Sequence, residues 1–128
     1  MTSNELSIGL GSLLRADQIS TADDVRAEHG TDKWHATALP DVVVFAESTE
    51  DVVAVMKFAS ANGVPVYTRA AGTGHTGGCV PVHGGILISV MRMNRILEIK
   101  PSDGVCVTQP GVITGDLQNA VREHGWYY

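Results

Sequence analysis

Residues 69–78 read Arg-Ala-Ala-Gly-Thr-Gly-His-Thr-Gly-Gly and form the segment of this chain best suited to bind a ligand. The segment follows a strand-like run, Val64–Thr68, and its glycines leave the backbone with little side-chain cover. Because glycine accepts positive φ, successive N–H groups can turn toward one concavity that binds an anion. The sequence therefore predicts a main-chain site for a pyrophosphate.

The spacing Gly72-x-Gly74-x-x-Gly77 also matches the fingerprint of Rossmann folds, whose third glycine lies in a helix. Here that helix is not expected, because residues 78–85 contain Pro81 and three more glycines. A nicotinamide-dependent enzyme would need a helix over residues 77–84. A glycine-rich connection without any ligand stays open as an alternative, since a lone glycine motif is a weak signal.

Size and charge narrow the class of protein. The 128 residues suffice for one small domain with a core. Nine basic and fourteen acidic residues give a net charge of −5, so we expect no nucleic acid partner. No apolar stretch approaches the roughly 20 residues that span a bilayer. Cys79 and Cys106 are far apart in the sequence, so we expect a reduced, cytoplasmic protein. No two histidines have the i, i+4 or similar spacing of metal ligands, so we expect no metal site.

Helix and strand patterns alternate from Ser20 onward. The periodicities and turn signals predict helices over residues 21–29, 49–62 and 114–124 and strands over residues 41–46, 64–68, 86–90, 95–100 and 105–109. The strand, helix and strand over residues 41–68 form a compact β-α-β unit in this interpretation. Its helix begins with a capping box, Ser48 and Asp51, and carries an apolar face made of Val52, Val55, Met56 and Ala59.

The two ends of the chain lead to separate expectations. Residues 1–19 lack the basic start and apolar core of a secretory signal, and we expect a poorly ordered lead-in before a domain over residues 20–128. Trp126-Tyr127-Tyr128 follows the stop of the last helix, where a strand or an ordered loop is expected to begin. We therefore expect the chain to be the N-terminal part of a longer domain.

Four segments in this order carry a resemblance to a known family: Pro40–Val53, Pro65–Gly78, Arg92–Ile99 and Gln109–Val112. Together they resemble the FAD-binding (PCMH-type) domain of the vanillyl-alcohol oxidase and p-cresol methylhydroxylase superfamily. The glycolate oxidase and D-lactate dehydrogenase subgroup is the most similar part of it. The resemblance runs from about residue 30 to the last residue.

This resemblance implies an α+β fold, the N-terminal part of a two-lobed domain. A small β-α-β lobe would be followed by the start of a lobe with a more antiparallel sheet. The implied function is to hold FAD in an oxidoreductase that oxidises the alcohol carbon of a small 2-hydroxy acid. Catalytic groups would lie beyond Tyr128, and this chain alone would be inactive. A noncatalytic remnant, or a half-domain that needs a partner chain, is the alternative of another class.

The resemblance carries the cofactor-binding role to twelve positions: Arg69, Ala70, Ala71, Gly72, Thr73, Gly74, His75, Thr76, Gly77, Gly78, Pro110 and Gly111. The backbone of residues 70–76 would face the pyrophosphate, with hydroxyl donors from Thr73 and Thr76. Arg69 would either contact the phosphate directly or have a structural role, in which it braces the loop or pairs with a carboxylate. The turn at Pro110 and Gly111 would either lie along the flavin or only start the last helix.

His75 departs from the glycolate oxidase-like pattern, which usually has leucine at this position. Sugar-alcohol and aldonolactone oxidases of the same superfamily have a histidine there, joined covalently to the 8α-methyl carbon of the flavin. The resemblance therefore leaves two possibilities open. His75 would carry covalent FAD, or it would pack or hydrogen-bond at the edge of a noncovalent flavin.

Overall fold

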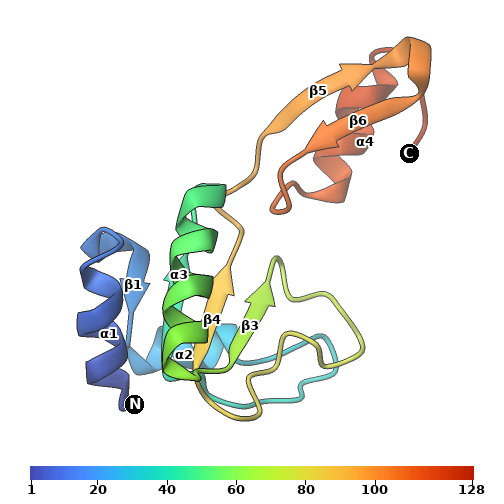
Figure 1. Cartoon of the computed structure of the whole chain (residues 1–128). Helices are drawn as coiled ribbons and strands as arrows, with labels where there is room; N and C mark the ends of the chain where they lie inside the picture. Colours follow the sequence, from blue (N-terminus) through green and yellow to red (C-terminus); the bar gives the residue numbers. More distant parts are fainter.

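The computed structural model describes residues 1–128 as two lobes joined by one linker (Figure 1). The first lobe contains a four-stranded sheet, and the second contains a two-stranded sheet with one helix. The helices are α1 (Ser3–Gly11), α2 (Asp23–His29), α3 (Thr49–Asn62) and α4 (Thr114–Arg122), with short 3-10 turns η1 (Ala16–Gln18) and η2 (Pro101–Asp103). The strands are β1 (Ile19–Ser20), β2 (Val42–Phe45), β3 (Val66–Arg69), β4 (Ile86–Ser89), β5 (Ile96–Lys100) and β6 (Val105–Thr108).

The first sheet has the strand order β1-β2-β4-β3. Strand β4 pairs in parallel with both β2 and β3, and β1 pairs antiparallel with β2. The predicted β-α-β unit is present, but β4 lies between its two strands. The reason is burial: β4 is buried along its whole length, which suits a central strand, whereas β3 is partly exposed and lies at the edge.

The N-terminal segment corrects one expectation. Residues 1–19 are an ordered part of the fold, not a poorly ordered lead-in, because α1 begins with a capping box between Thr2 and Glu5. Leu6, Leu10 and Leu14 recur every four residues and pack in the same core cluster as β2 and β4. This spacing is the signal of a helix with one buried face, so the segment could have been predicted from its leucines.

Helix α3 covers the sheet with the face that the sequence indicates, apart from one residue. The capping box of Ser48 and Asp51 is confirmed, and Gly63 ends the helix with a positive φ of 63°. Val55 and Ala59 are buried in the core. The sequence places Met56 on the same face, but it is 47% exposed because it lies at the edge of the face whose buried residues are Val55 and Ala59.

The second lobe is a β5–β6 hairpin with α4 packed against it through Leu117 and Val121. The predicted strand pair, the turn at residues 101–104 and the last helix are all confirmed. This lobe stands apart from the first sheet in Figure 1, so its position depends on the linker after β4.

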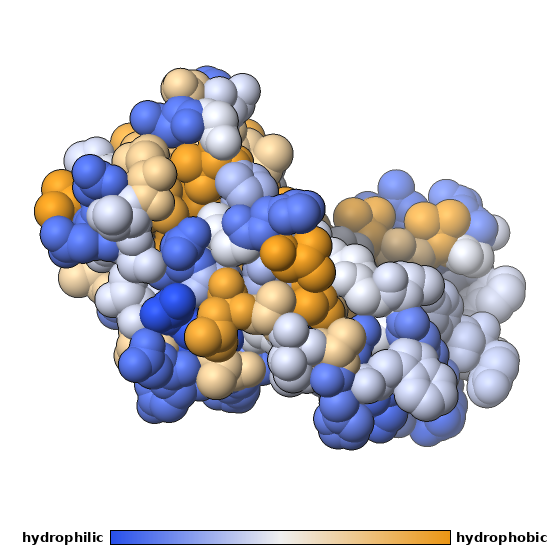
Figure 2. All heavy atoms as spheres, turned by 90° about the horizontal axis from the view of Figure 1, so that it is seen from below, coloured by the Kyte–Doolittle hydropathy of each residue, from blue (hydrophilic) through white to orange (hydrophobic).

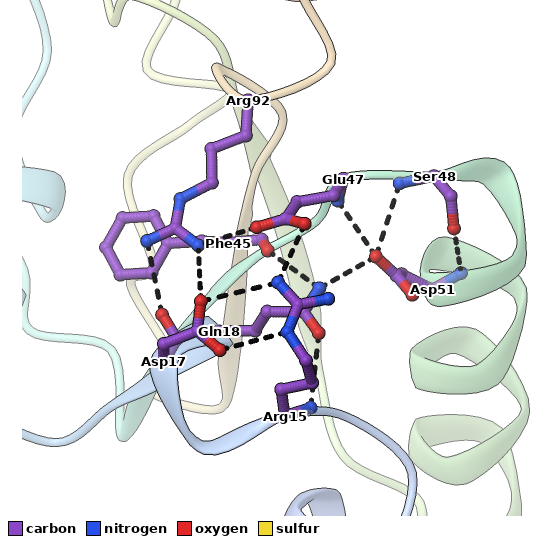
Figure 3. A network of polar contacts seen from close by, with 8 residues as sticks. All are labelled: Arg15, Asp17, Gln18, Phe45, Glu47, Ser48, Asp51 and Arg92. Carbon is purple, nitrogen blue, oxygen red and sulfur yellow. Dashed lines mark hydrogen bonds and ion pairs between the residues drawn. The ribbon is translucent and has the colours of Figure 1, made fainter.

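A polar network fixes that linker to the first lobe (Figure 3). Arg92 donates to Glu47 at 2.8 Å, and its guanidinium lies 4.8 Å from the centre of the Phe45 ring. Arg15 donates to the other oxygen of Glu47 at 2.8 Å. These hydrogen bonds, first that of Arg15 and then that of Arg92, lower the pKa of the Glu47 carboxyl. Glu47 thus links the start of the chain to the segment between the lobes.

The surface shows no single dominant apolar area on its lower face. Figure 2 shows hydrophobic residues in several separate groups among hydrophilic ones. Scattered apolar residues of this kind are normal on a protein surface. None of the helices combines the length and the apolar character that crossing a membrane would require.

Candidate functional site

The glycine-rich segment is an irregular loop that leaves the end of β3 and returns to the sheet through turns before β4 (Figure 1). Gly72 and Gly77 have positive φ of 70° and 73°, a conformation that favours glycine. Residues 77–84 form turns and no helix, so the helix that a Rossmann site requires is absent. The prediction of an irregular main-chain loop is confirmed.

The loop offers unpaired donors and open space. None of the backbone N–H groups from Ala70 to Cys79 donates a hydrogen bond to another group of the chain. The loop borders a cavity of about 220 Å³. A Cβ atom added at Gly74 would meet no atom within 4 Å. Unpaired backbone donors around a small open concavity suit the phosphate groups of a dinucleotide, so the loop fits this part of FAD.

Arg69 braces this loop. It lines the cavity, and its Nη1 donates to the carbonyl oxygen of Thr31 in the segment after α2. Its guanidinium also occupies the space where a Cβ atom of residue 72 would lie, which explains the glycine at that position. Arg69 forms no salt bridge with a carboxylate. Arg69 therefore connects the loop to this segment, and its contact with a phosphate stays a prediction.

The side chains of the loop divide into two groups. Thr73 and Thr76 line the cavity, where their hydroxyl groups can act as donors. His75 lines neither this cavity nor its neighbour. Its ring lies against Trp34, with the ring centroids 5.5 Å apart and an angle of 52° between the ring planes. Sequence reasoning missed Trp34, although a lone tryptophan in the polar segment Thr31–Thr37 is a visible signal.

A second cavity lies between the glycine loop and the turn before α4. It has a volume of about 430 Å³ and is lined by Ala70, Ala71, Thr73, Met91, Pro110, Gly111, Val112, Ile113 and Thr114. The structure therefore brings together the two segments to which the resemblance assigned the cofactor. The lining residues of the two cavities include no carboxylate and no histidine. The site can bind a ligand, but it offers no such group for proton transfer.

Gly111 positions the turn in this second cavity. Its N–H donates to the carbonyl oxygen of Met93 at 2.8 Å. A Cβ atom at residue 111 would collide with the Val90 carbonyl oxygen and would lie 2.9 Å from that of Met93, so only glycine allows this close approach. The contact holds Pro110 and Gly111 against the linker after β4. The linker thus sets the distance between the glycine loop and the turn.

Comparison with protein families identifies the domain. The family model described as FAD binding domain matches residues 40–128. The matched range contains both cavities and every residue that lines them. It also contains the sheet strands β2, β3 and β4 that position the loop.

Three curated relatives extend this finding. The chain is 34% identical over 128 residues to an uncharacterized FAD-linked oxidoreductase of Mycobacterium tuberculosis, an alignment that covers 98% of the chain and 28% of the relative. It is 34% identical to a D-lactate dehydrogenase of Anaerostipes hadrus, covering 87% of the chain and 24% of the relative. It is 38% identical to the glycolate oxidase subunit GlcD of Escherichia coli, covering 70% of the chain and 18% of the relative. The chain thus spans less than a third of the length of these relatives.

Solved structures show the same fold. An alkyldihydroxyacetonephosphate synthase superposes with a TM-score of 0.82 at 21% identity, over 95% of this chain and 27% of that one. A p-cresol methylhydroxylase superposes with a TM-score of 0.80 at 24% identity, over 95% of this chain and 25% of that one. The superpositions show the fold, and the family match over residues 40–128, together with the curated oxidoreductase relatives, shows that the chain belongs to the FAD-binding domain family of flavin oxidoreductases, with FAD as the cofactor of the family.

Proposed function

We propose that this chain holds FAD in an oxidoreductase that oxidises the alcohol carbon of a small 2-hydroxy acid. The observation that carries the proposal is the run of unpaired backbone N–H groups from Ala70 to Cys79 around an open cavity. The substrate class is supported by relatives named D-lactate dehydrogenase, D-2-hydroxyglutarate dehydrogenase and glycolate oxidase subunit. Lactate, 2-hydroxyglutarate and glycolate are all 2-hydroxy acids. A cytoplasmic location stays a prediction, supported by two free cysteines.

The residues of this chain would bind and orient the cofactor. The backbone of residues 70–76 would donate to the pyrophosphate, with the hydroxyl groups of Thr73 and Thr76 beside it. Pro110 and Gly111 would line the space next to the loop. The hydride equivalent of the substrate carbon would pass to the bound FAD and the hydroxyl proton to a base, which leaves a 2-oxo acid.

The proton-accepting base is proposed to lie outside this chain. The two cavities contain no carboxylate and no imidazole among their lining residues. The chain also covers only 28% of the length of its mycobacterial relative. We therefore expect weak FAD binding and no turnover by this chain alone, because the small loop cavity can enclose only part of so large a cofactor.

Gly74→Val tests the proposed cofactor site. Gly74 lines the cavity and has no positive φ and no neighbour within 4 Å of its Cβ position, so valine should add bulk beside the loop backbone without disturbing the fold. In a titration of the ¹⁵N-labelled chain with FAD, the amide signals of residues 70–78 should shift in the original protein and stay in place in the variant. Gly115→Val is the matched control, because residue 115 has open space but lies on α4. If FAD at millimolar concentration shifts no loop amide of the original protein, the proposal is wrong.

A second candidate function is a sugar-alcohol or aldonolactone oxidase with covalent FAD. His75 supports it, because the imidazole is exposed and belongs to the loop that borders the proposed cofactor site. The test is acid precipitation of the longer protein in which this chain is expected to hold FAD, purified with its flavin. Yellow colour that stays in the pellet, and is lost in His75→Ala, supports the bond. Colour that acid releases from the original protein excludes it.

A further inference from the structure

Trp34 is a large aromatic residue that the fold holds out of its core. Its side chain is 70% exposed, although tryptophan is usually largely buried. It lies in the short segment Thr31–Thr37, which follows α2 and runs beside the glycine loop in Figure 1. An exposed aromatic ring next to a ligand site is the kind of residue that binding sites use.

The segment around Trp34 is rigidly built. The carboxylate of Asp32 is buried, and its Oδ1 accepts hydrogen bonds from the N–H groups of Trp34 at 2.9 Å and Ala36 at 3.1 Å. Thr31 and Thr37 form an antiparallel bridge at the two ends of the segment. The exposure of Trp34 is therefore imposed by an ordered turn.

Two contacts join this turn to the glycine loop. Arg69 donates to the carbonyl oxygen of Thr31 at the base of the turn. The Trp34 ring lies 5.5 Å from the ring of His75, measured between centroids. Trp34 and His75 thus form a pair of neighbouring rings at the rim of the loop, and this pair is called the aromatic rim below.

The size of the loop cavity gives the aromatic rim a role. Ligand pockets for molecules of moderate size have volumes of about 300–1,000 Å³, whereas the loop cavity has only about 220 Å³. It can take the diphosphate of FAD but not the rings at the two ends of the dinucleotide. One ring can extend along the second cavity toward Pro110 and Gly111. The aromatic rim offers a second surface for a planar ring.

We infer that Trp34 stacks on one of the two aromatic rings of FAD, with the His75 ring beside it at an angle of 52° to the indole. The inference rests on the proposed function. The isoalloxazine and the adenine share the relevant chemistry, a flat π-system that stacks in an offset arrangement on an indole. Such stacking needs no hydrogen-bonding partner from the chain, so the open position of Trp34 is the geometry that it requires.

Titrations of the ¹⁵N-labelled chain with FAD, FMN and ADP test this assignment. The chain has two tryptophans, so the indole N–H signals of Trp34 and Trp126 can be distinguished by Trp34→Phe. FAD should shift the Trp34 indole signal together with the loop amides and leave that of Trp126 in place. A comparable shift with FMN identifies the isoalloxazine as the stacked ring, and one with ADP identifies the adenine.

The outcomes separate the inference from the proposed function. If the amides of residues 70–78 shift but the Trp34 indole does not, the inference is wrong and the proposed function stands. If the loop amides do not shift, the proposed function is wrong and the inference with it.

Variants of Trp34 give a second readout. Trp34→Ala should weaken FAD binding by about 5- to 150-fold, the usual effect of removing a stacked aromatic residue, and Trp34→Phe should keep most of the affinity. Trp126→Ala is the matched control, since Trp126 is a partly exposed tryptophan of the second lobe. The amide spectrum of each variant reports whether its fold is intact. Unchanged FAD affinity of a folded Trp34→Ala would overturn the inference.

Discussion

The guanidinium of Arg69 donates to the carbonyl oxygen of Thr31, and this bond ties the glycine loop to the turn after α2. Arg69 ends the edge strand β3, whereas Thr31 precedes β2 on the other side of the central strand β4. The bond therefore connects two irregular segments that no strand pairing connects. The glycine loop borders the proposed cofactor site, and the turn contacts that loop through Thr31 and Trp34.

Arg69→Gln should loosen both segments. A hydrogen bond of a charged donor contributes about 1.5–3 kcal/mol to stability, and Arg69 is partly buried. We expect a lower free energy of unfolding by about 1–2 kcal/mol and faster amide hydrogen exchange in residues 31–37 and 70–79. Arg95→Gln is the control, because Arg95 is exposed and lies in the second lobe. Equal exchange rates in Arg69→Gln and the original protein would contradict the bracing role.

Gly111→Ala should disturb the junction of the two lobes. The added Cβ atom would collide with the Val90 carbonyl oxygen and lie 2.9 Å from that of Met93, so the turn must move away from the linker. We expect a loss of about 1–3 kcal/mol in the free energy of unfolding in urea, as for other overpacked sites. Gly115→Ala has open space on a helix and should be stabilising by about 0.5–1 kcal/mol. If Gly111→Ala did not lower the free energy of unfolding, Gly111 would not be tightly packed.

Asp51 should make the fold sensitive to acid. Burial acts to raise the pKa of its carboxyl, but hydrogen bonds from the Glu47 N–H, the Gln18 amide and Ser48 outweigh burial and lower it. Because the folded pKa is the lower one, the stabilisation is complete above the unfolded pKa of about 3.9 and is lost as the pH falls through the folded value.

Asp51→Asn tests this pH dependence. It should cost about 1 kcal/mol at pH 7 through the weakened helix cap, and its stability should fall less steeply below about pH 4. Urea unfolding at a series of pH values measures both effects. Asp103→Asn, at an exposed position, is the control. Parallel pH profiles for Asp51→Asn and the original protein would exclude this role.

Leu10→Ala tests the structural role of the N-terminal helix. Leu10 is fully buried in the core cluster, so truncation should cost about 2–5 kcal/mol. Ile8→Ala in the same helix is the control, because Ile8 is 69% exposed and should change stability by less than about 0.5 kcal/mol. Thermal or urea unfolding measures the difference. A small effect of Leu10→Ala would mean that α1 does not stabilise the domain.

The sequence by itself determined the local elements and the chemical character of the loop. The capping box at Ser48 and Asp51, the hairpin turn at residues 101–104 and the irregular course of residues 77–84 all follow from short-range rules for capping, turns and helix breaking. Such rules involve neighbours in the chain, which is why a single sequence reveals them.

Only the tertiary structure decided which of these elements meet. It placed β4 between β2 and β3, packed the leucines of α1 into the core and brought Pro110 and Gly111 beside the glycine loop. It also brought the Arg69 guanidinium to the carbonyl oxygen of Thr31 and the Trp34 ring next to the ring of His75. These contacts depend on the burial of distant apolar segments against one another. The local sequence pattern can indicate which face of an element is buried, but not which distant segment covers it.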